Sequence, residues 1–127
     1  MPSGEYRGTL LGESLQVDAV VEVPLAVHRV ARTASGDTDV GQPRDWTFVE
    51  FSVAAEDVDA LTSALSKSLL REGGWCCDFH SDLEVVVVFR DRIFRYQAGD
   101  RAAREEAKRY ARSMGVPESQ LDWAEPK

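Results

Sequence analysis

The second half of this chain changes its hydrophobic period from helix to strand and back to helix, and this change limits its possible folds most. Apolar residues recur every three or four positions over 56–71 and again over 101–114, which predicts two amphipathic helices. Between them the period is two, which predicts three antiparallel strands over 75–96. We therefore expect an α+β, two-layer domain with both helices on one face of a mainly antiparallel sheet, as in ferredoxin-like or secretion-chaperone-like sandwiches.

The ends of both helices are marked by residues that favour termination or capping. Gly73 and Gly74 permit a left-handed backbone and predict the end of the first helix. Asp100 is the expected N-cap of the second helix, and Gly115 and Pro117 follow its end. The two helices are therefore expected to be separate, well-bounded elements.

Alternation in the strand region predicts which side chains face the core. A tight turn at Asp91-Arg92 and a three-residue loop at 81–83 place the bulky side chains on one face, the predicted core: Trp75, Cys77, Phe79, Val85, Val87, Phe89, Phe94 and Tyr96. The opposite face is the candidate interaction site, and it carries Cys76, Asp78, His80, Glu84, Val86, Val88 and Arg95. If no helix covers it, Val86 and Val88 form an exposed apolar strip of the kind that marks contact surfaces.

The first half is less regular. Apolar residues on both faces of 46–53 predict a strand inside the sheet, with 25–33 as its partner and 6–11 as a further strand. Segment 15–23 fits either a strand or a short helix, and the composition of 35–44 predicts a mobile loop. Near the C-terminus, Leu121 and Trp123 are expected to dock on the body. Since no repeat or linker divides the chain, we predict a single domain over 1–127.

Composition excludes several classes of protein. With 127 residues, 43% of them hydrophobic, the chain has enough apolar residues for a core and does not resemble a disordered protein. It shows neither a signal peptide nor an apolar stretch long enough to cross a membrane, so we expect a cytoplasmic protein with reduced thiols and no membrane partner. A net charge of −7 disfavours nucleic acid, although segment 90–112 carries +4 and the rest −11.

Three C-terminal segments carry a resemblance: GGWCCDFHSDLEVVVVF, RIFRYQAGD and REEAKRYARSMGVPESQLDW. Over about residues 44–124 the chain resembles a family of small uncharacterised bacterial proteins. The resemblance implies a cytosolic stand-alone domain, and it brings no catalytic motif.

The candidate residues have the right atoms for chemistry but the wrong spacing. Side chains on one face of a strand lie about 6.5 Å apart, whereas zinc needs three or four ligands at about 2.0–2.3 Å. Without a twist or bulge, at most two or three of Cys76, Asp78 and His80 could converge, so the geometry disfavours a metal site. Cys76 and His80 lie about 13 Å apart along a strand, too far for a thiol–imidazole pair. We therefore predict no catalytic residue, no metal and no cofactor.

Three hypotheses for function follow. The leading one is a noncatalytic protein-interaction or accessory module, acting as a homodimer or with another protein through the face of Val86 and Val88. The first alternative is a small-molecule or metal binder, or a small enzyme, that uses the polar cluster of Asp78, His80, Glu84 and Arg95. The second alternative is nucleic-acid contact through segment 90–112. The sequence favours a protein without enzymatic activity.

Overall fold

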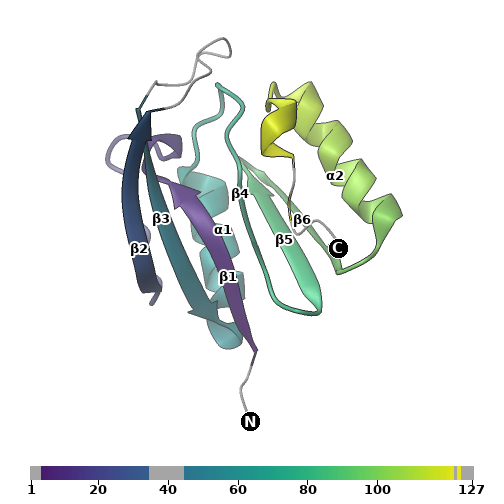
Figure 1. Ribbon diagram of the computed structural model, residues 1–127, viewed down its shortest axis with the longest axis horizontal. Coiled ribbons are helices and arrows are strands. Elements are labelled where there is room, and N and C mark those ends of the chain that lie inside the picture. Colours follow the sequence, from purple (N-terminus) through teal and green to yellow (C-terminus); the bar gives the residue numbers. More distant parts are fainter. Residues whose placement is uncertain (1–3, 35–44, 122, 124–127) are drawn as a thin grey trace.

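The computed structural model describes residues 4–34, 45–121 and 123, which form a six-stranded antiparallel sheet and two α-helices. The strands are β1 (Glu5–Leu11), β2 (Ala26–Ala34), β3 (Asp45–Ala54), β4 (Cys77–His80), β5 (Glu84–Phe89) and β6 (Arg92–Gln97). The helices are α1 (Val58–Ser68) and α2 (Arg101–Ser113), with short 3₁₀ turns at Gly12–Ser14, Ala55–Asp57 and Glu118–Gln120. The strand order is β2-β3-β1-β4-β5-β6 (Figure 1).

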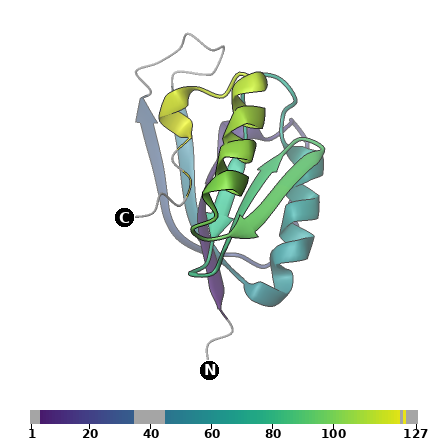
Figure 2. The same cartoon turned by 90° about the vertical axis from the view of Figure 1, so that its right-hand side faces the viewer.

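The α+β class and the mainly antiparallel sheet are therefore confirmed. The order of the elements, three strands and a helix followed by three strands and a helix, differs from the βαββαβ order of a ferredoxin-like domain. The predicted position of the helices is also wrong, because they pack on opposite faces of the sheet. Figure 2 shows α1 and α2 on either side of the hairpin of β5 and β6. One core contains Leu61 and Leu65 of α1, and the other contains Ala107 and Ala111 of α2.

Strand β5 explains why the helices lie on opposite faces. Five consecutive residues from Val85 to Phe89 are buried. Val86 and Val88 belong to the core under α1, while Val85 and Val87 belong to the core under α2. A strand that is apolar on both sides needs cover on both faces, and one helix supplies each cover.

The turn between β4 and β5 accounts for the error in the predicted faces. Ser81 N–H donates to the Glu84 carbonyl at 2.9 Å, so the loop has two residues and His80 pairs with Val85. A shift of one residue moves a strand's side chains to the other face. Cys77 and Phe79 consequently share the α1 face with Val86 and Val88.

The hairpin of β5 and β6 keeps the predicted faces although its turn differs. Phe89 pairs with Arg92, so the turn residues are Arg90 and Asp91, and Asp91 has a positive φ of 63°. Relative to the predicted pairing the register shifts by two residues, which leaves Phe94 and Tyr96 on the face of Val85 and Val87.

Other predictions are confirmed or corrected locally. The strands expected over 6–11, 25–33 and 46–53 are β1, β2 and β3, and β3 lies inside the sheet. Segment 15–23 is neither strand nor helix, apart from a single bridge between Leu15 and Leu69. The predicted mobile loop at 35–44 lies outside the described residues.

The helix ends follow the predicted capping only in part. Asp100 caps α2 by accepting a hydrogen bond from Ala103 N–H at 3.0 Å, as predicted. Helix α1 instead ends at Ser68, before Gly73 and Gly74, because Leu69 is already extended and buried. Near the C-terminus, Leu121 and Trp123 are 3% and 2% exposed, which confirms that this segment docks.

Candidate functional site

The sheet divides the predicted interaction site between its two faces. The register places Asp78 and His80 opposite Val87 and Val85, on the α2 side, whereas Glu84 and Arg95 project to the α1 side. The predicted exposed strip of Val86 and Val88 is wrong, since both are 0% exposed beneath α1. Cys76 is partly buried against the core under α2.

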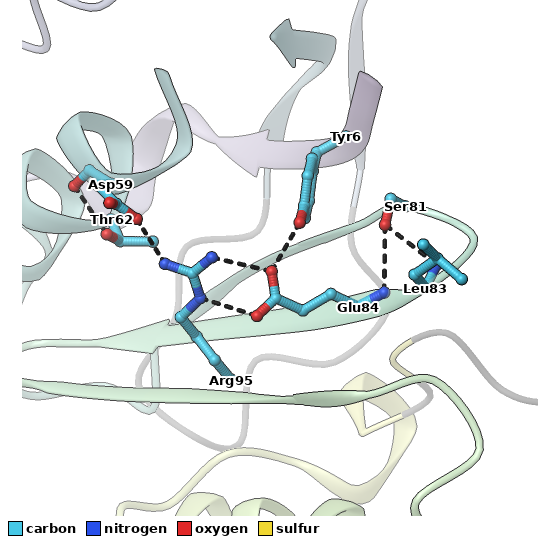
Figure 3. Close-up of polar contacts among 7 residues, drawn as sticks. All are labelled: Tyr6, Asp59, Thr62, Ser81, Leu83, Glu84 and Arg95. Atoms are coloured by element: carbon cyan, nitrogen blue, oxygen red, sulfur yellow. Dashed lines mark hydrogen bonds and ion pairs between the residues drawn. The ribbon is translucent and has the colours of Figure 1, made fainter. Parts of the chain in front are cut away.

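Glu84 and Arg95 belong to a polar network that links three strands to α1 (Figure 3). Arg95 donates to both carboxylate oxygens of Glu84, with Nη2–Oε1 at 2.9 Å and Nε–Oε2 at 3.0 Å. The Tyr6 hydroxyl donates to Glu84 Oε1 at 2.6 Å, and Arg95 Nη1 donates to Asp59 Oδ1 at 2.6 Å. Every charge in the network has a partner within it, so its geometry is that of a structural tie.

The acid–base properties of this network agree with a structural role. The hydrogen bonds from Arg95 hold the pKa of Glu84 below its usual value. The hydrogen bond to the Glu84 carboxylate raises the pKa of Tyr6. Neither shift brings the group closer to neutral pH, as a general acid or base would require.

The two cysteines are poor nucleophiles because both thiols are buried. Burial raises the pKa of Cys76 to about 12 and raises the pKa of Cys77 well above its ordinary value. Since the thiolate is the reactive form, both thiols are protonated and unreactive at neutral pH. Cys77 Sγ lies 3.7 Å from the Thr9 carbonyl, to which it donates.

A shallow hollow lies on the sheet face that holds His80, and sequence reasoning missed most of it. It has a volume of about 230 Å³ and is lined by residues of β1 to β4, including Arg7, His28, Glu50 and His80. His28 Nε2 lies 2.8 Å from Ser52 Oγ, and Arg29 donates to Glu50 at 2.7 Å. Among the described residues, no group of three or more His, Cys, Asp or Glu side chains is placed to hold a metal ion.

Most basic side chains of segment 90–112 contact other groups of the protein, several of them at its surface. Arg104 donates to the carbonyls of Leu121 and Trp123, and Arg92 stacks over the Phe94 ring at 4.5 Å. These contacts favour a structural role for the segment over nucleic-acid binding. At least six of its eight basic side chains contact protein groups: Arg90, Arg92, Arg95, Arg104, Lys108 and Arg112.

The two edges of the sheet differ in their protection. Strand β6 is short, carries Arg92 and Arg95, and contacts both helices. Strand β2 has nine residues, eight of them exposed, and β3 is the one element it contacts extensively in the described part of the chain. Its Val27 and Val30 are 54% and 63% exposed. A long edge strand with exposed apolar side chains can pair with another chain.

The fold and these surfaces define an α+β domain with a hollowed sheet face and with an edge strand, β2, that is largely exposed in the described part of the chain. The chain matches no protein-family model, no curated protein and no solved structure. The resemblance in the C-terminal half therefore stays a prediction. No helix within the described ranges is both long and apolar enough to span a membrane.

Proposed function

We propose that this protein is a noncatalytic interaction module that forms a homodimer by pairing strand β2 with β2 of a second copy. The observation that carries the proposal is the exposure of β2, a nine-residue edge strand with two exposed valines. Pairing would satisfy the outer backbone groups of β2 and would remove Val27 and Val30 from water.

The shape of β2 supports pairing along its C-terminal part. A bulge between Val27 and Arg29 breaks the register with β3, whereas Arg29 to Ala34 pair regularly with Glu50 to Asp45. Bulges oppose edge-to-edge pairing, so the regular stretch is the part that a second strand would extend. Val30 lies in this stretch.

Charge also permits a second copy at this edge. Strand β2 carries two arginines, which would repel their equivalents across a two-fold interface if they were unpaired. Arg29 is paired with Glu50 at 2.7 Å, and Arg32 with Glu13 at 2.8 Å. Each copy therefore brings a nearly neutral edge to the other.

The test is the mass of the protein in solution as a function of concentration. Multi-angle light scattering on the unmodified chain should show a dimer that dissociates on dilution. The Val30→Lys variant should stay monomeric, because a lysine on an edge strand opposes pairing. Val17→Lys is the matched control, since Val17 is 91% exposed and lies outside β2.

The mass in solution, circular dichroism and the melting temperature together decide the result. Circular dichroism should be the same for both variants, and their melting temperatures should agree at dilutions where both are monomeric, because neither valine is buried in the monomer. A monomer at every concentration would overturn the proposal. A dimer that Val30→Lys leaves intact would overturn the assignment to β2.

A further inference from the structure

We propose that Arg7 and His80 form a binding site for an anionic oxygen group, a carboxylate or a phosphate, on the hollowed face of the sheet. The site lies on β1 and β4, two strands away from the β2 edge, and it does not depend on the proposed dimer. The argument rests on register, on the hollows around the two residues, and on their unused hydrogen-bonding capacity.

Register brings the two side chains together. Arg7 of β1 is the direct partner of His80 of β4 and of Ser52 of β3. Residues directly opposite in an antiparallel pair have Cβ atoms about 4.5–5.5 Å apart, so a guanidinium and an imidazole can hold one ligand group between them. His28 contacts Ser52 from the far side of β3, which extends the polar row across four strands.

Arg7 and His80 also line a second hollow, of about 610 Å³, at the turn between β4 and β5. They therefore stand where two surface depressions meet. A ligand group held between them has space on both sides, so the remainder of a larger molecule can extend in either direction.

Both side chains have donors to spare. The ion pair of Arg7 is a long one of 3.9 Å to Glu5, and both side chains are more than half exposed. Such a pair is weak, and it leaves most of the five N–H donors of the guanidinium available. His80 makes no side-chain hydrogen bond or ion pair within the described part of the chain, and its side chain is exposed.

The two arginines of strand β2 show the contrast. Arg29 and Arg32 each contact a carboxylate at 2.7 or 2.8 Å. The pair of Arg29 and Glu50 neutralises the one carboxylate that lines the smaller hollow. Glu5, Asp78 and Asp82 are the remaining nearby acids. Glu5 and Asp82 line the larger hollow, and Glu5 competes directly with a ligand for Arg7.

The chemistry of the ligand follows from the donors. A guanidinium presents two parallel N–H groups that match the paired oxygens of a carboxylate or phosphate. The imidazole N–H of His80 supplies a third donor from the neighbouring strand. The chain as a whole carries −7 and repels anions, so the attraction for the ligand must come from Arg7. Salt screens this attraction, and binding is therefore expected to be strongest at low ionic strength.

The experiment is an NMR titration of the full chain with inorganic phosphate and, separately, with acetate, at constant low ionic strength. We expect saturable shifts of the backbone amides of residues 7–9 and 80. Arg7→Gln should weaken binding about tenfold or more, the usual loss for a hydrogen bond to a charged group. His80→Gln should weaken it several-fold, and Glu5→Gln should tighten it.

Arg109→Gln is the matched control, because Arg109 is an exposed arginine on α2 that lines neither hollow. Tighter binding of phosphate would identify a phosphate ligand, and tighter binding of acetate a carboxylate such as an acidic side chain. The proposal is overturned if no shift saturates at these amides, or if Arg7→Gln and Arg109→Gln weaken binding equally. If the His80→Gln variant binds the anion as tightly as the unmodified chain does, the assignment of His80 to the site is wrong.

Discussion

Gly8 shows at the scale of single residues how a missing side chain permits the packing of the sheet. It lies in β1 between Phe51 of β3 and Phe79 of β4, whose rings meet edge to face with centroids 6.0 Å apart. A Cβ at this position would lie 2.5 Å from the Asp78 carbonyl oxygen and 2.6 Å from Phe79 Cβ. We expect Gly8→Ala to lower the free energy of unfolding by about 1–3 kcal/mol in urea titrations, as overpacking does.

Gly12→Ala is the control for this prediction, since its nearest atom would be Thr47 Cβ at 3.4 Å, an ordinary contact. Equal losses for the two variants would contradict the packing argument. The sequence alone could not single out Gly8, because the two phenylalanines approach it from strands far away in the chain.

At the scale of secondary-structure elements, Arg95 ties α1 to the hairpin of β5 and β6 through Glu84 and Asp59. Glu84→Gln should lower the free energy of unfolding at pH 7 by about 1 kcal/mol, less than for a buried charged hydrogen bond because Arg95 is about a third exposed. The pKa of Glu84 is lowered in the folded protein, so its stabilisation is present above the unfolded pKa of about 4.3.

This stabilisation is lost as the pH falls through the folded pKa, so the stabilities of wild type and Glu84→Gln should converge in acid. Urea titrations between neutral and acidic pH measure this convergence. Glu118→Gln serves as the control, because its ion pair with Arg112 is exposed and should contribute less. A difference between wild type and Glu84→Gln that does not depend on pH would refute the electrostatic explanation.

At the scale of the whole molecule, strand β5 couples two cores that lie on opposite faces of one sheet. Trp123 closes the core under α2 against Phe89, and Leu65 of α1 lies in the other core. We expect Trp123→Ala and Leu65→Ala each to lower the free energy of unfolding by about 3 kcal/mol. Transitions followed by circular dichroism and by tryptophan fluorescence should coincide for both variants, because β5 belongs to both cores. Separate transitions would show that the two layers unfold independently.

Much of the fold could be predicted from local patterns. The hydrophobic period indicated both helices and the strands of the second half, and apolar composition indicated the three strands of the first half, although it also allowed an element over 15–23 that is absent. Asp100 was identified as a cap from its position alone. These features depend on residues close in the chain, whose backbone preferences and side-chain spacing act within one element.

The candidate site depended on long-range pairing instead. Arg7 and His80 are 73 positions apart in the sequence, and they meet because β1 inserts between β3 and β4. The faces of β4 depended on a single residue in the loop between β4 and β5: the apolar pattern favoured a three-residue loop, and the structure has a two-residue one.

Local sequence thus determined which segments are helices and strands, since side-chain periodicity and capping act over a few residues. Tertiary structure decided which face each strand presents, where the helices pack, and which polar side chains meet. Val85 to Phe89 make the distinction clear, because their apolar run indicated a strand but the positions of α1 and α2 decided what each side of it contacts. The reason is physical: register and layer packing are set by the joint burial of distant apolar surfaces, which no local segment specifies.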